Sequence, residues 1–196
     1  MTPTDDATAQ RLVDVVLRVI EEGGFEAVTV EAVAAQGDYD AAALRRYYPT
    51  RRDLLLSVLD RLQGWLFDVL EHAQVRAVDP LDALEQVFTT HIAFVGNRPA
   101  IPKLMLNLLV AEDDAVRSRV QGILAEYESN IGLLARQAKR KGALSQEVDV
   151  EALVVLVVGL LQSLLLRMRL PGHDGLSPGA MRRAFQVMLR GIAGGG

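Results

Sequence analysis

Residues 33–55 read VAAQGDYDAAALRRYYPTRRDLL, and this stretch decides the fold. A tight turn carries two carboxylates, Asp38 and Asp40, and four arginines and two tyrosines follow within the eight positions 45–52. The spacing predicts two short helices joined by this turn, with arginine and tyrosine exposed on the second helix. Such an arrangement meets the physical requirements of a helix-turn-helix, because outward arginines can contact phosphate or guanine.

The rest of the chain repeats its apolar residues at intervals of three and four, which predicts an all-α fold. Its length of 196 residues suits one domain, or a small domain joined to a larger one. We expect Thr29, Asp79 and Asp149 to cap helices, and glycines 23, 24 and 142 to follow helix ends. About nine helices are expected, at 5–22, after Thr29, at 41–47, from about 51, from 80, near 100–110, at 113–141, at 150–170 and at 177–192.

Composition excludes several classes of protein. The formal net charge is −4, so any contact with nucleic acid must come from a local basic patch. The absence of cysteine excludes disulfides, thiolate zinc sites and thiol catalysis. The three histidines lie far apart, and no phosphate-binding glycine loop or nucleophile elbow is present, so we expect no catalytic residues, metal or cofactor.

No secretory signal pattern opens the chain. The longest charge-free apolar run, residues 152–166, is shorter than the roughly 20 residues that span a bilayer. We therefore interpret this run as a buried helix and expect a cytoplasmic protein without a membrane partner.

The order of elements in residues 10–60 resembles the TetR family of transcriptional regulators. The resemblance implies a helix-turn-helix domain at 1–50 and a helical domain for ligand binding and dimerisation at 51–196. Where the family usually has a turn glycine and a capping serine, this chain has Asp38 and Asp40. The matching positions are Gly24, Phe25, Thr29, Val33, Ala34, Leu44, Tyr47, Tyr48, Thr50, Arg51, Leu54 and Leu55.

The resemblance implies a homodimeric, ligand-responsive regulator, most simply a repressor of a palindromic double-stranded DNA operator. Phosphate contacts are expected from Thr29, Arg45, Tyr47, Thr50 and Arg51, and base contacts from Ala41, Ala42 and Arg46. Asp40 could accept from a cytosine amino group, but capping a helix explains it without DNA.

An alternative interpretation remains open. Residues 1–52 carry six arginines against nine acidic residues, so the arginine cluster could be a solvated face. The chain would then be a TetR-like helical dimer whose DNA-binding half has drifted and which binds a ligand or another protein.

The family layout also implies a pocket in the larger part of the chain and a dimer interface in its last two helices. A mostly apolar pocket would take a small hydrophobic or aromatic effector, although the sequence favours an ordinary core role for any single one of its residues. The candidate pocket residues are Trp65, Phe88, His91, Met105, Leu108 and Tyr127. The candidate dimer residues are Val158, Gly159, Gln162, Leu165, Phe185, Met188 and Leu189.

Overall fold

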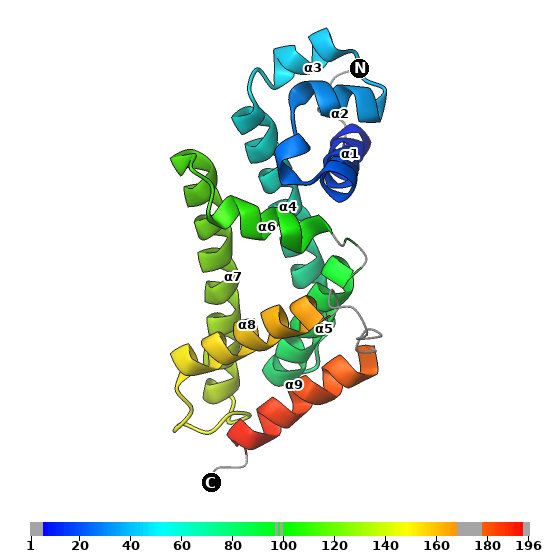
Figure 1. The fold of residues 1–196 in the computed structure, drawn as a ribbon. Helices are drawn as coiled ribbons and strands as arrows, with labels where there is room; N and C mark the ends of the chain where they lie inside the picture. The colour runs from blue at the N-terminus through cyan, green and yellow to red at the C-terminus, as the bar shows by residue number, and fades with distance from the viewer. Residues whose placement is uncertain (1–5, 97, 99, 168–177, 194–196) are drawn as a thin grey trace. The chain divides into compact units, whose positions relative to one another are not determined.

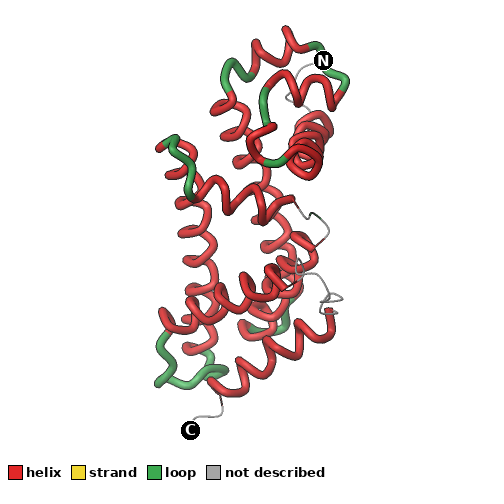
Figure 2. The backbone as a smooth tube through the Cα atoms, viewed as in Figure 1, coloured by secondary structure: helices red, strands yellow, loops and turns green. Residues whose placement is uncertain are grey.

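The computed structural model describes residues 6–96, 98, 100–167 and 178–193. Within these ranges the chain is helical and contains no strand, so the predicted all-α fold is confirmed (Figure 2). The helices are α1 Asp6–Gly23, α2 Val30–Gly37, α3 Ala41–Tyr47, α4 Arg51–Arg76, α5 Pro80–Gly96, α6 Ala100–Leu109, α7 Asp114–Arg140, α8 Val150–Arg167 and α9 Pro178–Ala193 (Figure 1).

Aspartate caps start three of the longer helices. The Asp79 carboxylate accepts from the backbone N–H groups of Leu81 at 2.8 Å and Asp82 at 3.0 Å, at the start of α5. Asp149 accepts from the N–H of Glu151 at 2.8 Å at the start of α8, and Asp113 caps α7 in the same way. The caps predicted at Asp79 and Asp149 are therefore confirmed, because each satisfies donors that have no partner within the helix.

One element was not predicted. A single 3-10 turn, η1, covers Phe25–Ala27 between α1 and α2. Gly24 has φ 82°, a conformation that glycine adopts without strain, and there the chain leaves α1. The sequence predicted the end of α1 at the two glycines but gave no periodic signal for a three-residue turn.

The described chain divides into two compact units. The first comprises Met1–Trp65 and Arg98–Ile123, and the second comprises Leu66–Asn97 and Leu124–Gly196. In the first unit α1 is the central element, because α2, η1 and α6 all pack against it (Figure 1). Its buried side is fully enclosed at Val15, Val16 and Ile20. The Lys103 ammonium of α6 donates to the carbonyl of Ile20 at 3.3 Å, near the end of α1.

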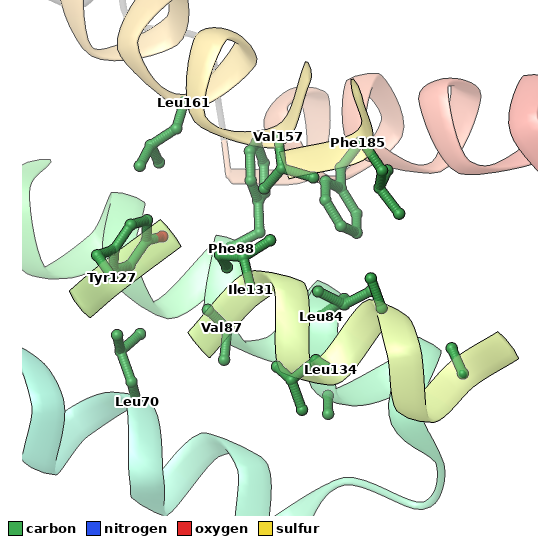
Figure 3. Packing of buried hydrophobic residues seen from close by; sticks show 14 of the residues in the cluster. Leu70, Leu84, Val87, Phe88, Tyr127, Ile131, Leu134, Val157, Leu161 and Phe185 are labelled. Atoms are coloured by element: carbon green, nitrogen blue, oxygen red, sulfur yellow. The ribbon is translucent and has the colours of Figure 1, made fainter. Parts of the chain in front are cut away.

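In the second unit α5 packs against α8 and α9. Phe88 of α5 and Phe185 of α9 are both fully buried and stack with their ring centroids 4.4 Å apart. Figure 3 shows this core, to which α4 and α7 also contribute Leu70 and Ile131. A polar contact borders it, since Glu85 of α5 pairs with Arg182 of α9 at 3.2 Å.

Among the described helices, none is long and apolar enough to cross a membrane.

Candidate nucleic-acid interface

The turn between α2 and α3 is held by two backbone hydrogen bonds. The N–H of Asp38 donates to the carbonyl of Ala35 at 3.4 Å, and that of Tyr39 donates to the carbonyl of Ala34 at 2.9 Å. This pattern is a Schellman motif with Asp38 at φ 54° and ψ 45°, in the left-handed region. Aspartate tolerates this region better than most residues, because its short polar side chain can bond locally. Asp38 thus lies in the tight turn that the sequence predicted between the two helices.

Gly37 is needed in the same turn because a neighbouring ring leaves no room for a side chain. The Tyr39 ring lies so close that a Cβ on Gly37 would meet its Cε2 at 2.3 Å. The Gly37 carbonyl accepts from the Arg11 guanidinium of α1 at 2.9 Å, and that guanidinium also lies 5.4 Å from the centroid of the Tyr39 ring. These contacts fix the turn against α1, so the angle at which α3 leaves α2 is set by packing.

Asp40 caps α3. Its carboxylate accepts from the backbone N–H of Ala43 at 3.0 Å. This hydrogen bond, with a second contribution from the N–H of Ala42, lowers the pKa of Asp40 below its ordinary value. The carboxylate is therefore ionised at neutral pH and has a structural partner that needs no DNA.

The face of α3 divides as the sequence predicted. Leu44 is 8% exposed and packs inward, whereas Arg45, Arg46 and Tyr47 are exposed. Ala41 and Ala42 are also exposed at the start of the helix. The outward surface of α3 therefore presents two methyl groups, two guanidinium groups and a phenol, a set that suits base edges and phosphates.

Arg45, an expected phosphate contact, is held by a carboxylate of its own unit. Arg45 forms an ion pair with Glu31 of α2, and the pair is exposed at both side chains. Hydrogen bonding from Arg45 is also the main cause that lowers the pKa of Glu31. In addition, Arg52 pairs with Asp113, the residue that caps α7.

Arg51 is held more tightly. Its guanidinium donates to the carbonyl of Phe25 at 2.9 Å and to the Glu26 carboxylate at 3.3 Å. It also lies 4.5 Å from the centroid of the Phe25 ring, within the range of a cation–π contact. Arg51 thus fastens the start of α4 to η1, a role that explains its place in the sequence without DNA.

Arg46 differs from its three neighbours. Among the described residues it makes no ion pair or hydrogen bond, and its positive charge acts on Asp40 only at longer range. Of the four arginines at positions 45–52, it is therefore the one that can contact DNA without first breaking an ion pair of the described chain.

The two threonines expected at phosphates are both helix caps. The Thr29 hydroxyl accepts from the N–H of Ala32 at 3.0 Å at the start of α2. Thr50 and Asp53 cap α4 reciprocally, since the Thr50 hydroxyl donates to the Asp53 carboxylate at 2.6 Å and accepts from the Asp53 N–H at 3.2 Å. Both threonines are exposed, so their hydroxyls lie at the surface next to helix N-termini, where anions are favoured.

Sequence reasoning missed the partners Glu26 and Glu31. Both carboxylates lie far along the chain from the arginines that they hold, so no local spacing rule reports the pairs. The excess of acidic residues in this part of the chain indicated that the arginines would form ion pairs. It did not identify the carboxylates that form them.

Comparison with known families decides the identity of the fold. Residues 12–58 match the family described as bacterial regulatory proteins, tetR family. Residues 80–188, more than half of the chain, match the tetracyclin repressor-like C-terminal domain. The chain belongs to the TetR family. It is therefore a transcriptional regulator with a helix-turn-helix DNA-binding domain, formed here by α1 to α3.

Individual relatives are distant. The HTH-type transcriptional repressor KstR of Mycobacterium tuberculosis is 25% identical over 114 residues, which are 58% of this chain and 52% of that protein. The chain thus matches about half the length of this curated relative. The nucleoid occlusion factor SlmA of Aliivibrio fischeri is 21% identical over 160 residues, 81% of this chain and 82% of that protein.

A solved structure agrees on the fold. The transcriptional regulator FadR of Bacillus subtilis, determined in complex with stearoyl-CoA, superposes with a TM-score of 0.75 at 15% identity. The match covers 95% of this chain and 98% of that one.

The residues expected to line a pocket fall into both units. Trp65, Met105 and Leu108 belong to the first unit, where Leu108 is fully buried and the Arg98 guanidinium lies 5.8 Å from the centroid of the Trp65 ring. The second unit holds the others, and it brings them together around one buried core. These residues are Phe88, His91 and Tyr127.

The residues expected at a dimer interface differ in burial. Phe185 is fully buried against Phe88, so its side chain belongs to the core of a single chain. Gly159 and Gln162 are exposed, and the side chain of Leu165 lies outside the described residues. Val158, Met188 and Leu189 are partly buried, and all three pack against the core.

Proposed function

We propose that this chain is a ligand-responsive repressor, which binds a palindromic operator as a homodimer in the cytoplasm and is released by a small hydrophobic molecule. The observation that carries the proposal is the outward face of α3. It presents Arg46, which forms no ion pair with the described residues, beside the exposed Ala41 and Ala42, on a helix that Asp40 caps. Arginine can bond the O6 and N7 atoms of guanine together, and alanine can contact the methyl group of thymine.

Exposed apolar surface on α8 and α9 supports the dimer. Val155, Leu156 and Leu166 of α8 are 70%, 50% and 60% exposed, and Val187 of α9 is 71% exposed. Apolar residues that recur along helices and stay exposed in one chain favour burial against a second copy. A twofold contact buries the same patch on both copies, and it would present two α3 helices to the two halves of a palindrome.

Regulation follows from linkage. A ligand can bind better to a conformation that is unable to span both half-sites. Such a ligand weakens DNA affinity at most by the ratio of its own affinities for the two conformations. One solved neighbour supports an effector with a long apolar part, since the FadR structure was determined with stearoyl-CoA, which carries an acyl chain. The buried core of the second unit has the matching character, because its members are aliphatic or aromatic.

The test uses the DNA that flanks the protein's own gene. Titration in a gel-shift assay should give saturable, sequence-dependent binding. Arg46→Ala should weaken specific binding roughly 5- to 100-fold, the range expected for losing a bidentate contact to guanine. The matched control, Arg140→Ala, removes an equal charge from the last turn of α7 in the second unit and should leave specific binding nearly unchanged. Equal effects of the two substitutions would remove the assignment of α3 as the reading helix.

A second candidate function rests on the ion pairs. Because Arg45, Arg51 and Arg52 are each paired with a carboxylate, the DNA-binding half could have drifted, leaving a dimer that binds only a ligand or another protein. Absence of specific DNA binding at low salt, in a protein that remains dimeric by light scattering, would favour this second candidate over the first.

A further inference from the structure

Two polar rings meet at the edge of the core of the second unit. His91 of α5 and Tyr127 of α7 lie edge to face, with ring centroids 5.0 Å apart and an angle of 72° between the planes. Tyr127 is 4% exposed, and Figure 3 shows its hydroxyl on the side toward Ile131 and Phe88. His91 as a whole residue is partly exposed, although its Nδ1 atom is buried. The pair therefore lies where the core meets the surface.

Both rings carry a polar atom whose hydrogen-bonding capacity is unused. Within the described residues, neither Nδ1 of His91 nor the hydroxyl oxygen of Tyr127 has a hydrogen-bond partner, and both atoms are buried. Buried polar side-chain atoms nearly always have a partner, because leaving one unmatched destabilises the fold. Two such atoms on rings in contact mark a place where a further group can bond to the protein.

The surroundings determine the charge of that group. The neighbouring core residues are apolar, among them Leu70, Phe88 and Leu161, and no charged residue is buried in the described chain. Burial lowers the pKa of His91 to about 4 and raises the pKa of Tyr127, so both rings are neutral near pH 7. A carboxylate or an ammonium group bound here would be desolvated without a counter-charge, which is strongly unfavourable.

We propose that His91 and Tyr127 form the polar end of the effector site, and that they select an uncharged apolar molecule with a hydroxyl or carbonyl oxygen. A ligand hydroxyl would accept from the Tyr127 hydroxyl and donate to Nδ1 of His91. A carbonyl oxygen would accept from both rings when the histidine proton is on Nδ1. The apolar remainder of the ligand would lie along the aliphatic and aromatic residues of the core. This inference rests on the proposed ligand response, and it adds the chemical class of the ligand.

Three probes of equal chain length test the selectivity at pH 7.5: decan-1-ol, decanoate and decyltrimethylammonium. Isothermal titration calorimetry on the full chain should show decan-1-ol binding at least tenfold more tightly than either charged probe. Equal affinities for all three, or a preference for a charged probe, would overturn the inference.

Two substitutions test the residues. Tyr127→Phe should weaken decan-1-ol binding roughly 3- to 10-fold, which is the effect of one lost hydrogen bond. The same change should raise the melting temperature of the unliganded protein, because it removes an unmatched hydroxyl, whereas a purely structural tyrosine would show no weakening of the probe. His91→Phe should weaken decan-1-ol binding in the same direction. The control, Tyr48→Phe in the first unit, removes a hydroxyl that accepts from Ser57 at 3.4 Å and should leave the probe affinity unchanged.

The outcomes separate this inference from the proposed function. Selective binding of decan-1-ol by a chain that does not bind DNA would retain the inference and remove the repressor. Specific DNA binding together with no probe binding, or with probe binding that Tyr127→Phe leaves intact, would retain the regulator and remove the role given to His91 and Tyr127.

Discussion

The buried imidazole of His91 predicts how the stability of the protein depends on pH. Its pKa is lowered from 6.5 to about 4, because burial disfavours the charged ring. In the unfolded chain the ring takes up a proton near its ordinary pKa, whereas in the folded protein it stays neutral. The free energy of unfolding is therefore highest above pH 6.5, falls as the pH drops from 6.5 toward 4, and loses nothing further from this group below 4.

The size of the effect follows from the two pKa values. Protonation of the unfolded state alone lowers the free energy of unfolding by about 2 kcal/mol between pH 7 and pH 5. His91 as a residue is partly exposed, so this value is an upper bound. Urea denaturation followed by circular dichroism at pH 7, 6 and 5 would measure the loss.

A substitution isolates this group from the rest of the protein. His91→Phe removes the titrating ring, so the difference in unfolding free energy between wild type and variant should change by up to about 2 kcal/mol across the same interval. Carboxylates whose pKa is lowered, such as Asp40 and Asp113, contribute equally to both proteins and cancel in the difference. The control, His72→Gln, removes an exposed histidine on α4 and tests whether the change depends on the buried ring. Identical profiles for wild type and His91→Phe would refute the assignment of a neutral, buried His91.

Three further predictions concern the interface with DNA and the contact between copies. Glu31→Gln frees Arg45, so in fluorescence anisotropy the plot of log affinity against log salt concentration should steepen by about one unit per chain. Glu21→Gln is an equal charge change at a residue that pairs with no arginine of the described chain, and it should have a smaller effect. Asp38→Gly relieves a left-handed aspartate and should raise the free energy of unfolding by about 1 kcal/mol in urea titration; a lower value would mean that the aspartate side chain stabilises the turn. Leu156→Glu places a charge on the exposed side of α8 and should raise the dimer dissociation constant at least tenfold by light scattering, and an unaltered dimer would exclude this face from the interface.

Local signals in the sequence were sufficient for most of the fold. The apolar spacing of three and four located the helices, and the caps at Asp79 and Asp149 lie where residue chemistry indicated. The same local rules assigned Asp38 to the turn and Asp40 to the start of α3. These features depend on neighbours within a few residues, which a sequence shows directly.

Features that depend on contacts between distant residues could not be predicted in this way. The pairing of Arg45 with Glu31 joins two helices, and the contact of Arg51 with Phe25 joins α4 to η1. Phe185 has the spacing of an interface residue, but its ring stacks on Phe88 of another helix. Apolar periodicity identifies the buried side of a helix and does not say whether the same chain or a second copy covers it.

The ion pairs around α3 also affect how a regulator would search a chromosome. Sequence-independent affinity for DNA comes mainly from cations that replace the counterions of phosphate. Arginines that form ion pairs with Glu31, Glu26 and Asp113 contribute less to that affinity, because each ion pair must break before the arginine can bind phosphate. Fewer molecules would then be retained on random DNA, and a small cellular pool would suffice to occupy the operator and to respond when the effector arrives.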